Sequence, residues 1–362
     1  MKKKPFLVST VLVTGLLLET SFVGFAQAET NDHQSQHAEI PSQKPTEPPT
    51  SGHLELDQSK LKSIDEKKGN VPEKVFGKDD RVRVSNYKDS PYRQVVLLNM
   101  TFPDGKTYIG SGTMIGDNAV LTAGHNVYSK GVGFATKITV YAGVNGQNYE
   151  IGKAESKKLM TLKQWQDSED SNYDMALITL DSDLGKKTGT LSVTSNMNVN
   201  EPIETSGFPG DKGGNVQYRA NGVIKNLTEH NIHYLMDTNP GQSGSSVRNT
   251  NQQVIGVHTY GNVDFNGATR LTALNIDYIK HWMGQPEAHP YQKNVKLLHS
   301  NSLLWKDLNF KNKVTEKHLK LDGTYKAKYL YHHPNGETYL SIYDANNKWV
   351  GYLDSKDVKI LK

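Results

Sequence analysis

The chain has 362 residues, of which 35% are hydrophobic and 22% are charged, and it contains no cysteine. A single core rarely extends beyond about 250–300 residues, so the length predicts more than one domain, and the lack of cysteine excludes disulfide scaffolds, cysteine nucleophiles and thiolate metal sites. The net charge of +4 is too small to indicate nucleic-acid binding, and no nucleic-acid partner is expected.

The first 28 residues have the pattern of an export signal. Residues 2–4 are lysines, residues 6–18 form a short apolar run, and residues 26–28 are Ala-Gln-Ala, a small-x-small cleavage pattern. An uncleaved membrane anchor is the alternative, but it needs about 20 apolar residues. We therefore expect residues 1–28 to be a signal peptide and the mature protein to be secreted and extracellular.

The next segment, 29–74, has the composition of an unfolded chain. It contains no Phe, Trp or Tyr, and it holds five of the 14 prolines. Its apolar surface is too small to offset the entropy of ordering it. The composition fits a linker or a pro-segment, and its place directly after an export signal favours a disordered pro-segment.

Residues 75–288 are predicted to form an all-β domain. Short runs of β-branched and apolar residues, separated by turn sequences such as Pro103-Asp104-Gly105, predict strands. The runs are 94–100, 108–115, 119–122, 138–142, 174–180, 203–207, 221–227, 233–236 and 254–257. One helix is predicted at Thr272–Met283, from its recurring apolar positions and from Gly284 at its end.

The tail, 291–362, is predicted to be a second, smaller β unit. It holds 13 lysines and no arginine against seven acidic residues, a net charge of +6, so the rest of the chain carries −2. Alternating residues in Tyr339–Tyr343 and Trp349–Leu353, joined by Asp344–Lys348, predict a β-hairpin.

Three segments of the first domain carry residues suited to nucleophilic catalysis. His125 ends an apolar run, Asp174 precedes another, and Ser243 lies in Pro240-Gly241-Gln242-Ser243-Gly244-Ser245. A serine hydroxyl needs a base to take its proton, histidine titrates in the right range, and a carboxylate orients the histidine. Each residue alone has an ordinary structural explanation, but together they predict the triad of a serine hydrolase. The order His, Asp, Ser along the chain matches an all-β protease and differs from that of α/β-hydrolases.

Glycines on both sides of Ser243 permit a tight backbone turn. In such a turn the amides of Gly241 and Ser243 are expected to face one developing oxyanion. The sequence thus supplies a nucleophile, a base, an orienting acid and oxyanion donors.

The boxes Thr122–His125, Tyr173–Leu177 and Gly241–Ser245 resemble those of the chymotrypsin-like serine peptidases. Residues 75–284 are similar to the secreted glutamyl endopeptidases of staphylococci and bacilli, with further matches at 206–212, 236–238, 256–258 and 265–268. The resemblance implies an all-β fold of two six-stranded β-barrels, with the triad between them and a C-terminal helix. One departure is Ser246, where proline commonly follows the Gly-Ser pair.

The resemblance also implies a preference for glutamate. In this family a threonine or serine before the nucleophile and a histidine after it line the specificity pocket, and Thr238 and His258 stand at these positions. A hydroxyl and an imidazole can bind a carboxylate by hydrogen bonds and partial charge. The third contributor in the family is the mature N-terminal amino group, which the resemblance assigns to Val75. We therefore expect protein or peptide substrates with Glu before the scissile bond, and an activating protease that cuts after Lys74.

The tail resembles the SH3-like GW modules with which bacterial surface proteins hold anionic cell-wall polymers. The motif is Lys348-Trp349-Val350-Gly351-Tyr352, with Tyr352 where the second tryptophan of the family would stand. We expect residues 291–362 to form a small SH3-like β-barrel that binds such polymers at the cell wall. A folded spacer or a substrate-facing domain is the alternative.

Two other functions remain open at this stage. One is a protease of narrow specificity similar to the exfoliative toxins, and the other is a surface adhesin with an inactive protease-like domain. No metal and no other cofactor are expected, because His230 and His233 have no evident third ligand and His332-His333, before Pro334, is expected to lie in a loop.

Overall fold

The computed structural model describes residues 37–39, 51–56, 62–63, 73–315 and 319–361. The predicted signal peptide, 1–28, lies outside the described residues. None of the described helices is both long and apolar enough to cross a membrane.

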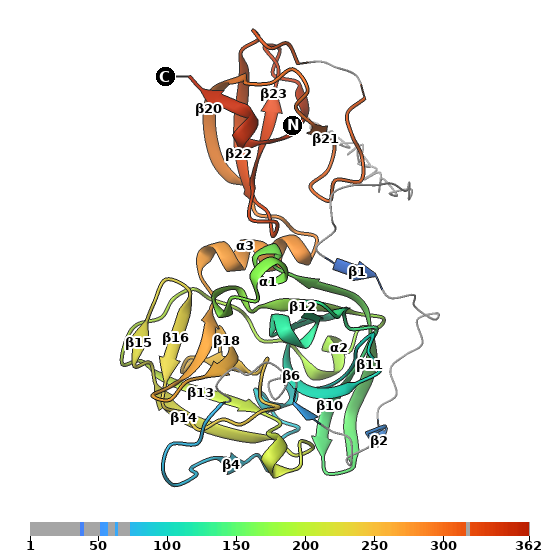
Figure 1. Cartoon of the computed structure of the whole chain (residues 1–362), viewed down its shortest axis with the longest axis vertical. Coiled ribbons are helices and arrows are strands. Elements are labelled where there is room, and N and C mark those ends of the chain that lie inside the picture. The colour runs from blue at the N-terminus through green and yellow to red at the C-terminus, as the bar shows by residue number, and fades with distance from the viewer. Residues whose placement is uncertain (1–36, 40–50, 57–61, 64–72, 316–318, 362) are drawn as a thin grey trace, which may run out of the picture. The chain divides into compact units, whose positions relative to one another are not determined.

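The first half of the protease-like part is a closed six-stranded barrel, in which sheet order runs β11-β10-β5-β6-β7-β12 and β12 pairs back onto β11. Its strands are β5 (Val95–Thr101), β6 (Thr107–Gly116), β7 (Ala119–Thr122), β10 (Lys137–Asn145), β11 (Asn148–Thr161) and β12 (Ala176–Leu180). Along β5, alternate residues Val96, Leu98 and Met100 fill the barrel interior, because successive side chains point to opposite faces of a strand. The long pair β10 and β11 lies side by side in Figure 1.

The second half is an eight-stranded sheet with the order β15-β16-β19-β18-β17-β13-β14-β4. Its strands are β4 (Val82–Arg83), β13 (Pro202–Gly207), β14 (Tyr218–Val223), β15 (Asn226–Leu227), β16 (Asn231–Tyr234), β17 (Ser246–Arg248), β18 (Val254–Gly261) and β19 (Asn266–Arg270). Its core includes Ile203, Ile232 and Val247. Two six-stranded barrels were expected; six strands of the first, nine-stranded sheet close into a barrel, and the second sheet has eight strands.

Helices are few, as expected for an all-β fold. They are α1 (Lys163–Ser168), α2 (Gly185–Thr188) and α3 (Ala273–Trp282), with short 3₁₀ turns η3 (Tyr92–Gln94), η4 (Gly124–Asn126), η5 (Ser171–Tyr173), η6 (Gly210–Lys212) and η7 (Ser355–Asp357). Helix α3 confirms the predicted helix: the Thr272 side chain accepts a hydrogen bond from the Asn275 N–H at its start, and Gly284 follows its end at a φ of 79°.

Three short strands fall within the segment 29–74, which differs from the expectation of disorder there. Strands β1 (His37–Glu39) and β2 (Gly52–His53) pair with β11, and β3 (Lys62–Ser63) pairs with β6. Backbone pairing at a sheet edge does not require an apolar side chain. Near β2, the segment also buries Leu54 beside Tyr141 and Tyr149. A small ribbon of β8 (Tyr128–Ser129) and β9 (Gly133–Phe134) completes this part.

The tail forms a separate six-stranded sheet with the order β21-β24-β23-β22-β20-β25. Its strands are β20 (His289–Leu297), β21 (Leu304–Trp305), β22 (Tyr325–His332), β23 (Thr338–Tyr343), β24 (Trp349–Asp354) and β25 (Val358–Ile360). The predicted hairpin is confirmed, with Tyr343 opposite Trp349, and the sheet has its own core around Val295, Ala327 and Leu340. This strand-rich unit is consistent with the expected SH3-like barrel.

Candidate active site

His125 and Asp174 are brought together by two neighbouring strands of the first barrel. His125 lies in η4 just after β7, Asp174 lies just before β12, and Ala176 of β12 pairs with Thr122 of β7. The His125 Nδ1 atom is 2.7 Å from Asp174 Oδ2, and the His125 backbone N–H donates to Asp174 Oδ1 at 2.9 Å. Both side chains are buried, so the carboxylate fixes the orientation of the imidazole ring.

Gly124 permits this close approach. A Cβ atom at Gly124 would lie 2.9 Å from Asp174 Oδ1 and 3.0 Å from Thr161 Oγ1. Any larger residue would therefore push the carboxylate away from His125. Steric contact with Asp174 thus explains why the Thr122–His125 box has a glycine at position 124.

Ser243 lies in the loop between β16 and β17. Its carbonyl oxygen accepts hydrogen bonds from the Ser111 N–H and from Asn126 Nδ2, both at 2.9 Å. Because Asn126 follows His125 directly, the second bond fixes the serine loop to the turn that carries the histidine. Gly241 and Gly244 have φ values of 103° and 91°, a region that favours glycine, so the loop depends on both.

The predicted specificity residues Thr238 and His258 are both fully buried. His258 belongs to β18, and its Nδ1 atom lies 2.5 Å from Tyr234 Oη and 3.1 Å from the Gly267 carbonyl oxygen. Burial, with the charge of Glu73 adding to it, raises the pKa of Tyr234 well above its usual value of 10, so its hydroxyl stays protonated. Tyr234 thereby holds the imidazole with its Nε2 edge toward Glu73.

The carboxylate of Glu73 lies between Ser243 and His258. Ser243 Oγ donates to Glu73 Oε1 at 2.7 Å, and His258 Nε2 lies 3.1 Å from the same oxygen, an ion-pair distance without the angle of a hydrogen bond. The Glu73 side chain is fully buried. Sequence analysis did not place Glu73 beside Ser243 and His258, although a glutamate two residues before the expected mature start was a signal for it.

The chain that follows Glu73 is hydrogen-bonded to Thr238, Asn266 and Asp237. The Lys74 carbonyl oxygen accepts from the Thr238 N–H at 3.2 Å and from Asn266 Nδ2 at 2.7 Å, and the Lys74 N–H donates to Asn266 Oδ1 at 2.9 Å. Two residues on, the Phe76 N–H donates to Asp237 Oδ1 at 2.7 Å. Val75, whose N–H belongs to the same peptide group as the Lys74 carbonyl, thus lies beside Thr238.

The structure joins several of the predicted residues in pairs. His125 contacts Asp174, the backbone of Ser243 is bound to Asn126 next to His125, and Thr238 is bound to the peptide group between Lys74 and Val75. Glu73 contacts both Ser243 and His258. A buried His–Asp pair, with a glycine-flanked serine on a loop that is fixed to the residue after the histidine, is suited to acyl transfer.

Comparison with known proteins agrees with this chemistry. The family model described as trypsin matches residues 83–283. An extracellular metalloprotease of Bacillus subtilis is 34% identical over 223 residues, which are 59% of this chain and 71% of that protein. A glutamyl endopeptidase of Bacillus licheniformis is 35% identical over 224 residues, 58% of this chain and 68% of that protein.

A solved structure of a Glu endopeptidase in complex with MPD has the same fold, with a TM-score of 0.54 and 31% sequence identity. The match covers 58% of this chain and 100% of that one. Both the sequence and the fold thus lead to one conclusion. The chain belongs to the trypsin family, and it is a chymotrypsin-like serine endopeptidase.

Proposed function

We propose that the protein is a secreted endopeptidase, made as a zymogen, that hydrolyses peptide bonds preferentially after glutamate. The observation that carries this proposal is the glutamate carboxylate of Glu73 between Ser243 Oγ and His258 Nε2. A pocket that accepts this side chain from its own chain is matched in size and polarity to a substrate glutamate. The relatives named glutamyl endopeptidases support the same preference.

In the proposed mechanism, Ser243 Oγ attacks the scissile carbonyl carbon while His125 takes the hydroxyl proton. Asp174, 2.7 Å from His125 Nδ1, orients the ring and stabilises the imidazolium that forms. The amides of Gly241 and Ser243 stabilise the oxyanion. His125 then gives its proton to the leaving amine, and water hydrolyses the acyl-enzyme by the same route in reverse.

Glutamate selection is assigned to Thr238 and His258. Thr238 Oγ1 is buried and has no hydrogen-bond partner among the described residues, so a substrate carboxylate would satisfy it. His258 can present an Nε2–H to that carboxylate because Tyr234 can donate to Nδ1. A glutamine would lose the charge interaction, and a lysine would place a second proton donor against both groups.

The zymogen character is assigned to Glu73. While Glu73 stays attached, its carboxylate occupies the place of a substrate glutamate and accepts a hydrogen bond from Ser243 Oγ, which keeps a substrate out. A cut between Lys74 and Val75 would free this residue and create an α-amino group on Val75, next to Thr238. The unperturbed pKa of such a group is about 7.7–8, so it is mostly charged at neutral pH and adds to carboxylate binding.

The tail is proposed to hold the enzyme to anionic cell-wall polymers. Trp349 is exposed and packs edge-on against Tyr352, which also contacts Tyr331. Lys328 Nζ lies 4.0 Å from the centroid of the Tyr343 ring. Together with the net charge of +6, these aromatic and basic side chains fit a negatively charged polymer.

Hydrolysis of matched peptides by three forms of the chain tests the central proposal. The forms are residues 29–362, a chain that starts at Val75, and the latter with one added N-terminal residue, each start confirmed by N-terminal sequencing. We expect the Val75 form to cleave after Glu much faster than after Gln, Asp or Lys, and the other two forms to be much slower. Equal cleavage after Glu and Gln would contradict the specificity. Equal rates for all three forms would contradict the role of Val75 and leave the Ser243 mechanism intact.

A further inference from the structure

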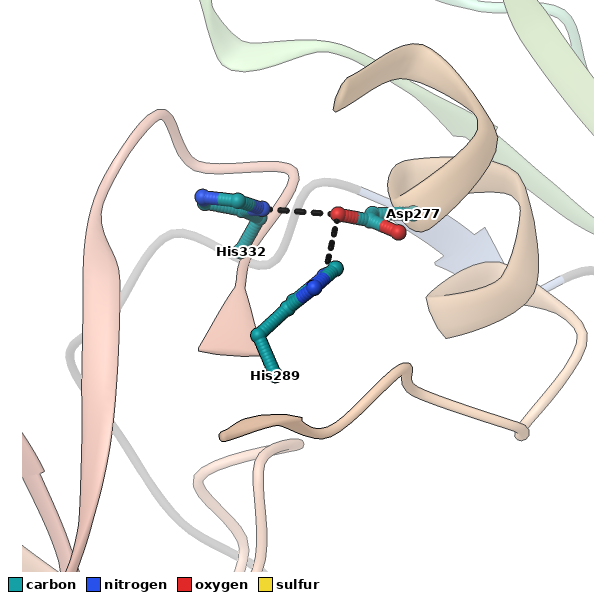
Figure 2. Close-up of side chains that lie close together, drawn as sticks. All are labelled: Asp277, His289 and His332. Atoms are coloured by element: carbon teal, nitrogen blue, oxygen red, sulfur yellow. Dashed lines mark hydrogen bonds and ion pairs between the residues drawn. The ribbon is translucent and has the colours of Figure 1, made fainter. Parts of the chain in front are cut away.

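A cluster of metal-ligating side chains lies outside the active site, where Asp277, His289 and His332 meet (Figure 2). Asp277 Oδ2 is 2.8 Å from His289 Nε2 and 2.7 Å from His332 Nδ1. All three ligand atoms lie within 4.8 Å of one another. Within the described part of the chain, this is the one group of three such residues that meets in this way.

The cluster is built from elements far apart in the sequence. Asp277 belongs to α3, His289 begins β20 and His332 ends β22. Strands β20 and β22 are antiparallel neighbours with His289 opposite Leu330, so His332, two residues beyond Leu330, projects from the same face as Leu330. Figure 2 shows both rings pointing toward the Asp277 carboxylate. The expectation that His332 lies in a loop was therefore wrong.

Other nearby imidazoles do not join the cluster. His333 Nε2 donates to the Leu308 carbonyl oxygen at 3.1 Å, and its Nδ1 accepts from the Asn335 N–H at 3.1 Å, so both of its nitrogens are used. Burial, together with the neighbouring His281, lowers the pKa of His333 to about 3, and its ring stays neutral. The candidate ligands are thus one carboxylate and two imidazoles.

We propose that Asp277, His289 and His332 bind one divalent transition-metal ion of the zinc class, which ties α3 to strands β20 and β22. Two histidines and a carboxylate are a typical donor set for zinc, with water as a fourth ligand. The two histidine side chains are 41% and 33% exposed, which leaves room for that water. None of the three residues has a role in the proposed peptide hydrolysis, so the ion is structural.

The two distances to Asp277 Oδ2 need to change only slightly for binding. Tetrahedral ligands at about 2.0–2.1 Å from zinc are about 3.3 Å apart, so each ring must move away from Asp277 Oδ2 by about half an ångström. On metal binding, His289 Nε2 and His332 Nδ1 lose their hydrogen bonds to Asp277 Oδ2. Each of the two neutral imidazole rings then carries its proton on its other nitrogen. The metal thus replaces two hydrogen bonds with three coordinate bonds, without a redox step.

Zinc titration of the untagged full chain, with Ser243→Ala to prevent self-digestion, tests the proposal. After removal of metals with EDTA and dialysis, calorimetry with Zn²⁺ should give one site per chain. Asp277→Asn, His289→Gln and His332→Gln should each weaken binding by about 10-fold or more, since even partners of ligands contribute 10–100-fold. The matched control is His299→Gln, which replaces an exposed histidine outside the cluster and should bind as the parent does.

Two further measurements keep the test independent of folding. Co²⁺ should give the intense visible absorption of a tetrahedral site in the parent and control but not in Asp277→Asn. Zn²⁺ should raise the Tm of the parent and control only, while all forms have similar Tm values in EDTA. Unchanged zinc affinity in all three variants, or no zinc binding by the parent, would overturn the proposal.

Discussion

Glu73 Oε1 is bound between two residues that are 15 positions apart in the sequence: Ser243 Oγ at 2.7 Å and His258 Nε2 at 3.1 Å. One carboxylate thereby joins the candidate nucleophile to the candidate specificity residue. The contact explains how an N-terminal segment of low apolar content can still be held on the protease domain. It also gives the proposed zymogen a defined point of inhibition.

Replacing Ser243 or His125 with alanine should lower kcat by roughly 10⁴–10⁶-fold, because the two residues act as one unit. The measurement is steady-state hydrolysis of a Glu-containing peptide by the chain that starts at Val75. Circular dichroism and Tm should match those of the parent chain. More than about a tenth of the parent activity in either variant would reject the proposed triad.

In the pocket, Thr238→Val should reduce kcat/KM for a Glu peptide by about 10-fold, because it removes one hydrogen bond to a charged group while keeping the volume. The same variant should change kcat/KM for a Gln peptide much less, because the uncharged glutamine side chain gains less from a hydrogen bond with the Thr238 hydroxyl. The ratio of the two kcat/KM values is the quantity to measure. A parallel loss on both peptides would assign Thr238 a structural role only.

Glu73→Gln in the 29–362 form should expose Ser243 to reagents. The substitution keeps the shape of the side chain but removes the charge next to His258, and a hydrogen bond with a charged partner is worth about 1.5–3 kcal/mol. We expect labelling of Ser243 by a fluorophosphonate to accelerate by about 10-fold or more. Glu55→Gln is the matched control, because Glu55 is an exposed glutamate of the same segment. Equal labelling rates in parent, control and variant would argue against inhibition by Glu73.

Removal of the tail should separate catalysis from attachment. A chain ending at residue 288 should hydrolyse peptides nearly as fast as the full chain but no longer sediment with isolated anionic cell walls. In the full chain, Trp349→Ala should weaken this binding, whereas Leu303→Ala, at another exposed apolar position of the same unit, should not. Binding is best measured at about 50 mM salt, where charge attraction is weakly screened. Equal sedimentation of the full and shortened chains would exclude a wall-binding tail.

The free energy of unfolding of the tail sheet should decrease as the pH falls from about 7 to 5, because His333 is protonated more readily in the unfolded state. Its folded pKa of about 3 is below the usual 6.5, so the unfolded state binds more protons in this range and stability falls as pH falls through 6.5. The loss is about 2 kcal/mol at pH 5. Hydrogen exchange in β22, corrected for intrinsic rates, should show this loss in the parent and less of it in His333→Gln. The same pH dependence in both chains would show that other groups cause it.

Much of the architecture follows from local sequence patterns. The strand at 119–122 and the hairpin 339–353 alternate or repeat apolar residues over short distances, and Thr272 and Gly284 define the ends of α3. Strand β11 was not predicted, because its 14 residues mix lysine and glutamate with apolar residues. Its pairing with β10 across the turn Gly146-Gln147, and with the more distant β12, makes it a strand.

By itself, the sequence determined which residues are chemically suited to catalysis: a histidine, an aspartate and a glycine-flanked serine in a recognisable order. The tertiary structure decided which side chains actually meet. Glu73 reaches Ser243 across 170 positions, and Asp277 reaches His332 across 55. Such contacts depend on the pairing of distant strands and on burial, and a carboxylate or imidazole that will be buried against a partner has the same local sequence signature as one that stays in solvent.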